Sequence, residues 1–143
     1  MKYTLIIDSE REEEVVVYAH GESKLTRDIE KLTCSEEQTV YAYGDYEILN
    51  ISLDSVACFF IEDGKLYAFK DKEKLYVKGR LYEIEERLSD RFVKINRSCI
   101  ANLDFIEKFK VTFGGALLAV FKNGYSDYVS RRELKKVKEK VGL

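Results

Sequence analysis

In the first 43 residues the spacing of apolar positions is typical first of strands, then of a helix, and then of a strand again. Leu25, Ile29 and Leu32 have helical spacing and follow Ser23, a residue type that caps helices. The flanking segments are rich in β-branched and aromatic residues, which is typical of strands. The pattern predicts strands over 2–8 and 14–20, a helix over 24–32 and a strand over 38–43.

After residue 46 the pattern becomes a series of short strands separated by turn sequences. Asp63-Gly64, Gly114-Gly115 and Asn123-Gly124 are typical of tight turns between antiparallel strands. The predicted strands span 56–61, 65–69, 74–78, 92–95, 106–113, 116–121 and 125–130, with helices over 81–88 and 131–141 and a connecting segment over 96–105. The fold class is therefore expected to be mostly β (α+β) with an antiparallel architecture.

Length and composition fit one globular domain with a short appendage. The chain has 143 residues, of which 45% are hydrophobic and 35% charged. We expect a small β-β-α-β segment over 1–46, too short for a core of its own, and a domain over 47–143. No apolar run approaches the length of a membrane span and no signal peptide is evident, so a cytoplasmic location is expected. Cys34, Cys58 and Cys99 are odd in number and widely spaced, which indicates buried packing thiols.

The net charge of −2 hides an uneven distribution. Residues 1–60 carry five basic and thirteen acidic side chains, a net of −8, whereas residues 61–143 carry 19 basic and 13 acidic ones, a net of +6. The basic part is a candidate phosphate-facing surface, although uneven charge also arises by chance.

Residues for catalysis are scarce. The single histidine, His20, lies in the acidic part, so no Cys/His or Ser/His/Asp arrangement is expected in the domain. There is no phosphate-binding loop and no zinc-type spacing, and the acidic run between Glu10 and Glu14 suits a solvated surface. We expect no enzyme, no cofactor, no metal and no small-molecule substrate.

Basic and amide side chains occur where strands end. Lys65 follows a hairpin turn, Asn96, Arg97 and Ser98 follow a strand, and Arg131 and Arg132 lie where the last strand gives way to a helix. Arginine can contact guanine through two hydrogen bonds, asparagine can do the same with adenine, and serine can bind phosphate. Residue types alone leave open that Arg97 and Arg132 form surface ion pairs with glutamates instead.

The spacing of these residues resembles a known pattern. Residues 92–106 read Phe-x-Lys-Ile-Asn-Arg-Ser-x-Ile-Ala-Asn-Leu-x-x-Ile, which resembles the signature of the LytTR family of bacterial DNA-binding domains. Residues 55–61, the helix over 81–88 and residues 117–132 match further parts of that pattern in order. The resemblance covers about residues 47–143.

The resemblance implies an elongated, mostly-β fold that binds repeated sites in double-stranded DNA by inserting loops into major grooves. Arg97 and Arg132 match base-reading positions, Lys65 a third contact loop, and Ser98 and Arg131 phosphate contacts. Asn96 stands where the family often has histidine, so its base preference or phosphate contact is expected to differ from theirs. The pattern implies that Asn102 braces a turn.

Many LytTR proteins are response regulators with a receiver domain, for which residues 1–46 are too short. The chain resembles instead the short receiver-less transcription regulators, whose partners are sometimes membrane proteins. We expect a homodimer, since two modules would match a repeated site. The alternative is a protein-interaction module that antagonises another regulator, which the basic loops disfavour.

Overall fold

The computed structural model describes residues 1–33 and 38–143, and these two ranges belong to separate compact units. Each unit is described by itself. Cys34, one of the three predicted packing cysteines, lies outside the described residues. In the described ranges no helix combines the length and the hydropathy that a membrane crossing requires.

Within residues 1–33 the first unit contains one regular element, the helix α1 (Lys24–Thr33), close to its predicted range. Ser23 caps it, because the Thr26 amide donates to the Ser23 hydroxyl oxygen at 3.3 Å. The strands predicted over 2–8 and 14–20 are wrong: both segments are exposed and without regular structure. A strand needs a neighbouring strand to complete its hydrogen bonds, and no described strand pairs with either segment.

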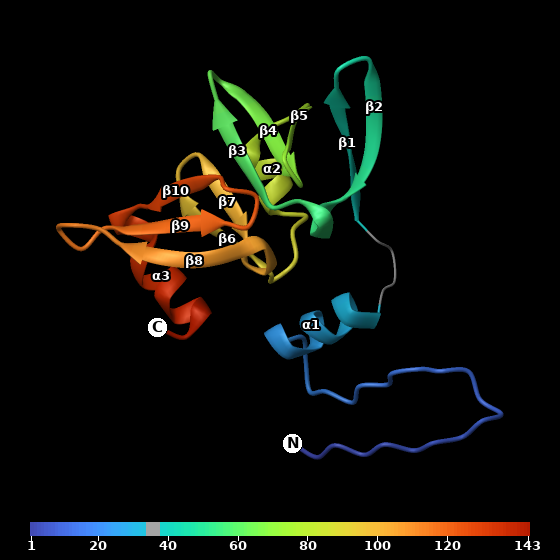
Figure 1. Cartoon of the computed structure of the whole chain (residues 1–143). Helices are drawn as coiled ribbons and strands as arrows, with labels where there is room; N and C mark the ends of the chain where they lie inside the picture. The colour runs from blue at the N-terminus through green and yellow to red at the C-terminus, as the bar shows by residue number, and fades with distance from the viewer. Residues whose placement is uncertain (34–37) are drawn as a thin grey trace. The chain divides into compact units, whose positions relative to one another are not determined.

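The second unit is built on a seven-stranded antiparallel sheet in the order β2-β1-β5-β4-β3-β7-β6 (Figure 1). Its strands are β1 (Thr39–Gly44), β2 (Glu47–Ser52), β3 (Cys58–Glu62), β4 (Lys65–Lys70), β5 (Glu73–Val77), β6 (Phe92–Asn96) and β7 (Cys99–Asn102). β7 lies in the stretch predicted to be a connecting segment, which is a correction. The predicted division at residue 46 stays a prediction, and β1 pairs with β2 and β5 of this sheet.

A separate three-stranded meander completes the β structure, as the turn sequences predict. It contains β8 (Ile106–Val111), β9 (Leu117–Phe121) and β10 (Ser126–Val129) in the order β10-β9-β8. The helices of this unit are α2 (Leu81–Glu85) and α3 (Arg131–Val141), and the 3-10 turns are η1 (Leu53–Ser55) and η2 (Leu103–Phe105). The α3 bounds agree with the prediction, whereas α2 is shorter than the predicted 81–88 because three-residue turns follow it.

The large sheet carries a hydrophobic cluster on each face. Phe59 belongs to one cluster with Leu81 and Ile84 of α2. Cys58 and Phe60, its neighbours in β3, belong to the other, which includes the meander and α3. β3 is thus buried on both faces, which explains why its sequence is apolar without alternation.

The cysteine prediction holds for the two described thiols. Cys58 and Cys99 are free and buried. The hydrogen bond between the Cys99 side chain and Cys58, together with burial, raises the pKa of the Cys99 thiol. The Cys99 thiol therefore stays neutral, and both buried side chains act as packing groups.

Asn102 braces the turn η2, as predicted, and this turn leads from the large sheet into the meander. Its side chain is fully buried, and its amide nitrogen donates to the carbonyls of Asp54 at 3.1 Å and Val56 at 3.0 Å. Its side-chain oxygen accepts the Asp104 amide at 3.0 Å. Both the oxygen and the nitrogen of this buried amide therefore have hydrogen-bond partners, as burial requires.

Candidate nucleic-acid interface

The turn between β6 and β7 holds Arg97 at its tip. Buried residues of both strands fix the two ends of the turn. Within it, the Ser98 amide donates to the side-chain oxygen of Asn96 at 2.8 Å, which closes a local turn of the kind that asparagine favours. Arg97 and Ser98 are exposed.

This turn is joined to the end of β10. The side-chain amide of Asn96 donates to the Tyr128 carbonyl at 2.9 Å, and the Ser130 amide donates to the Ile95 carbonyl at 2.8 Å. The second predicted loop, residues 130–132, is therefore a neighbour of the first, although more than 30 residues separate them in sequence.

α3 begins at this junction and carries two arginines in its first turn. Ser130 caps the helix, because its hydroxyl oxygen accepts the Glu133 amide at 3.3 Å. Arg131 and Arg132 are exposed and lie at the positive end of the helix dipole, where cations are unfavourable by about 0.3–1 kcal/mol each. Such a local departure from the usual charge preference is expected at functional sites.

The hairpin between β3 and β4 brings the third predicted loop to the same region. Asp63 and Gly64 both have positive φ, 51° and 73°, as a tight two-residue hairpin turn needs. The Ile61 amide donates to the Ser98 carbonyl at 2.8 Å, which ties this hairpin to the β6–β7 turn. Lys65, the first residue of β4, is exposed at the mouth of the hairpin.

Some other cations of this unit pair with carboxylates, whereas the arginines of the predicted loops do not. Arg91 pairs with Asp104 at 2.9 Å, and Lys74 pairs with Glu62. In the range 38–143, which the structure describes throughout, Arg97, Arg131 and Arg132 have neither an ion pair nor a side-chain hydrogen bond. The alternative that Arg97 and Arg132 form ion pairs with glutamates is thus not the arrangement found.

Asn96 has a different role in the geometry from that of the exposed arginines. Its oxygen and one amide hydrogen are used within the chain, so the side chain fixes the distance between two loops. The partner of this contact, the Tyr128 carbonyl, is a backbone group that sequence patterns cannot point to.

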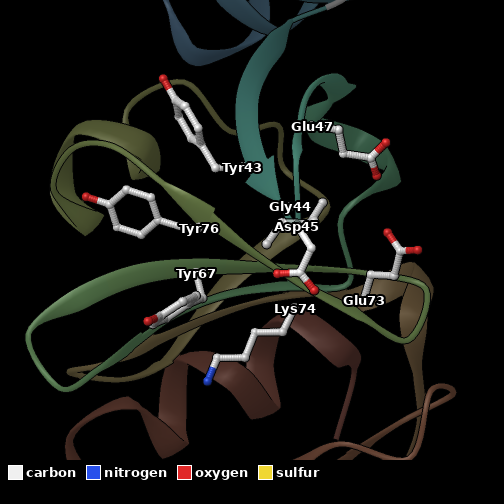
Figure 2. Close-up of a pocket in the computed structure, with 9 residues that line it drawn as sticks. Tyr43, Gly44, Asp45, Glu47, Tyr67, Glu73, Lys74 and Tyr76 are labelled. Atoms are coloured by element: carbon white, nitrogen blue, oxygen red, sulfur yellow. The ribbon is translucent and has the colours of Figure 1, made fainter.

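A second surface feature is a hollow of about 450 Å³ where β1 diverges from β5 (Figure 2). Its lining includes three tyrosines, Tyr43, Tyr67 and Tyr76, and three carboxylates, Asp45, Glu47 and Glu73. The Lys74 ammonium lies 4.4 Å from the centre of the Tyr67 ring, and that of Lys78 lies 5.4 Å from the Tyr43 ring. Because the chain's own lysines already face two of these rings, the hollow is not an open aromatic cage for a cation.

A comparison with known proteins gives a match over the same part of the chain. The family model for the LytTR DNA-binding domain matches residues 46–142. Two regulators of Staphylococcus aureus, from strains NCTC 8325 / PS 47 and MRSA252, are each 32% identical over 108 residues, which cover 76% of this chain and 74% of theirs. Both are named uncharacterized HTH-type transcriptional regulators.

A solved structure gives the same fold. The LytTR DNA-binding domain of a response regulator from Bacillus cereus superimposes with a TM-score of 0.68 at 22% identity, over 73% of this chain and 97% of that one. In the described part of this chain no two helices are consecutive elements, so no helix-turn-helix pair is present there.

Proposed function

The chain belongs to the LytTR family of DNA-binding domains, and from that premise we propose that it regulates transcription by reading repeated sites in double-stranded DNA. The reading elements are the loops 63–65, 96–98 and 130–132. One observation carries the proposal: hydrogen bonds connect these loops through the strand residues beside them, and two of the loops expose guanidinium groups that lack a partner among the described residues.

The residue roles follow from side-chain chemistry. Arg97 and Arg132 contact guanine edges in the major groove, because a planar guanidinium fits the two acceptors of guanine. Lys65, Ser98 and Arg131 contact phosphates and fix the position of the module on the duplex. Asn96 acts mainly by holding the two arginine-bearing loops at a fixed distance.

We further propose that the protein binds DNA as a homodimer assembled through its first unit. Ile7 and Tyr18 are 88% and 95% exposed, and no residue of α1 is buried. Covering such apolar surface is favourable by roughly 25 cal/mol per Å². A second copy supplies the same segment, and two linked modules match two copies of a site.

The function as an interaction module that antagonises another regulator has less support. It requires the fold but not the exposed cations at three neighbouring loops. LytTR proteins form a family of DNA-binding regulators and not of enzymes, which agrees with the scarcity of catalytic residues in the sequence.

The test is selection of bound sequences from a random pool of DNA duplexes with the full chain. We expect enrichment of one motif that occurs twice at a fixed spacing. Enrichment of a single unrepeated motif would remove the repeated-site part of the proposal. Recovery of random sequence at low salt, where phosphate contacts are strongest, would overturn sequence-specific binding altogether.

A further inference from the structure

The turn between β8 and β9 leaves the meander at the same end as the start of α3. Val111, Leu117 and Val129 form one row across the three strands. The turn that follows Val111 and the helix that follows Val129 therefore begin side by side at one end of this sheet. In Figure 1 the turn, in orange, projects beyond the end of β10.

The turn is ordered by its own hydrogen bonds. The amide and the hydroxyl of Thr112 donate to the Ala116 carbonyl at 2.8 and 3.0 Å, and the Gly115 amide donates to the Thr112 carbonyl at 3.0 Å. Gly114 and Gly115 have φ values of 91° and 83°, which other residues adopt only with strain. The hydrogen bonds of the turn thus hold the backbone of Phe113 in one conformation.

Large apolar side chains at this tip are uncovered. Phe113 is 108% exposed and Val111 is 75% exposed, whereas Leu117, in the same row as Val111, is 4% exposed. Phe113 and Val111 are two residues apart, so this tip exposes more apolar surface than a single scattered side chain would.

Cations flank the apolar tip. Lys108 and Lys110 of β8 are exposed and have no ion pair among the described residues. Lys110 lies in one row with Leu118 and Tyr128, and the Tyr128 carbonyl is the group that holds Asn96. The surface that carries the three proposed loops therefore continues along the meander towards the turn.

We propose that the turn 112–116 is a fourth DNA-binding element, in which the phenyl ring of Phe113 lies against sugar and base edges of a minor groove and Lys110 contacts phosphate. This inference rests on the proposed DNA-binding function. Apolar side chains that enter the minor groove unstack base steps and bend the duplex, and neighbouring cations fix the backbone. The expected consequence is a bend that depends on Phe113.

A duplex suits this tip better than another protein surface. A stable protein interface buries about 800 Å² on each partner, which is far more than one turn supplies. The flanking lysines and the neighbouring Arg131 favour an anionic partner that already lies against this end of the molecule.

The experiment compares Phe113→Ser and Phe113→Tyr in the full chain on the duplex recovered by selection. We expect Phe113→Ser to weaken binding roughly five- to tenfold and to reduce the bend measured by circular-permutation gel shift, and Phe113→Tyr to retain most of both. Tyr82→Ser is the matched control, because Tyr82 is also an exposed aromatic residue but lies on α2, on the other side of the large sheet. Circular dichroism and melting temperature check that each variant is folded.

The outcomes separate this inference from the proposed function. If the wild-type chain enriches no sequence, the proposed function fails and this inference fails with it. If wild-type binding and the loss in Arg132→Ala are as expected but Phe113→Ser binds and bends DNA unchanged, only this inference is overturned. Phe113→Ser could instead leave DNA binding intact and change the sedimentation of the protein or its binding to anionic vesicles. That result would assign the turn to a protein or lipid contact and would also overturn this inference.

Discussion

The side-chain amide of Asn96 donates to the backbone carbonyl of Tyr128 at 2.9 Å, while its oxygen accepts the amide of Ser98 at 2.8 Å. One side chain thus shapes the turn that carries Arg97 and attaches it to the strand that leads into Arg131 and Arg132. Recognition groups held in advance at a fixed spacing lose less entropy on binding. The exposed arginine side chains are long and flexible, so a fixed spacing between them has to come from the backbone that carries them.

Asn96→Ala removes both hydrogen bonds. We expect the free energy of unfolding to fall by about 1 kcal/mol and DNA affinity to fall as well, because the spacing of the two loops is no longer fixed. Urea denaturation and fluorescence anisotropy measure the two effects. Asn50→Ala is the control, since Asn50 is exposed on β2 and has no side-chain hydrogen bond among the described residues. Affinity that stays at the wild-type value in Asn96→Ala would mean that the loops are held by other contacts.

Arg132→Ala removes a proposed base contact. We expect a loss of about 1–3 kcal/mol on the selected site and a relaxed preference at one base position, because a bidentate contact discriminates that base. Repeating the selection with the variant reveals the altered position. Lys138→Ala, on the exposed side of the same helix, is expected to change affinity little. An unchanged base preference in Arg132→Ala would exclude Arg132 from base reading.

Arg131→Ala tests a phosphate contact through the salt dependence of binding. Each neutralised phosphate contributes a slope of about −0.9 to log K against log salt concentration. We therefore expect the slope to become shallower by about that amount, with the base preference retained. A slope equal to that of the wild type would show that Arg131 does not face phosphate.

Stability should decrease at alkaline pH. Burial, followed by the neighbouring Cys99 and Asp127, raises the pKa of the Tyr125 phenol above its ordinary value of 10.0. The folded protein holds this proton more tightly than the unfolded chain does. The contribution of Tyr125 to the free energy of unfolding is therefore complete below pH 10 and is lost as the pH rises above it. Urea denaturation from pH 8 upwards should show that the free energy of unfolding declines with pH. The decline per pH unit should be smaller in Tyr125→Phe.

The Cys99 thiol has a raised pKa for related reasons, so Tyr125→Phe should reduce the alkaline decline and not abolish it. Tyr41→Phe is the control, because Tyr41 is exposed on β1. An identical decline in Tyr125→Phe and wild type would assign the effect to other groups.

The proposed dimer depends on the apolar residues of the first unit. Ile7→Lys and Val16→Lys place charges on surface that a second copy would cover, so we expect a shift from dimer to monomer and weaker binding to a duplex with two sites. Sedimentation equilibrium gives the mass, and duplexes with one or two sites give the cooperativity. If the wild-type chain is monomeric both alone and on DNA, the segment is better explained as the docking site of a regulator protein, for example a membrane protein.

Local patterns in the sequence determined most of the elements of the domain. The tight turns at Asp63-Gly64, Gly114-Gly115 and Asn123-Gly124 depend on residue types that adopt positive φ, so they could be predicted without knowing the neighbours. The family motif added the expectation that Arg97, Arg132 and Lys65 act together. These are statements about positions along the chain.

Only the tertiary structure decided which strands exist and which loops are neighbours. β7 consists of four buried residues without alternation, and residues 2–8 form no strand despite a favourable composition, because a strand depends on a partner elsewhere in the chain. The contacts from Asn96 to Tyr128 and from Ile61 to Ser98 span more than 30 residues and use backbone carbonyls that every residue has. Long-range hydrogen bonds of this kind leave no mark in local sequence, so the assembly of the loops into one surface follows from the packing of the two sheets.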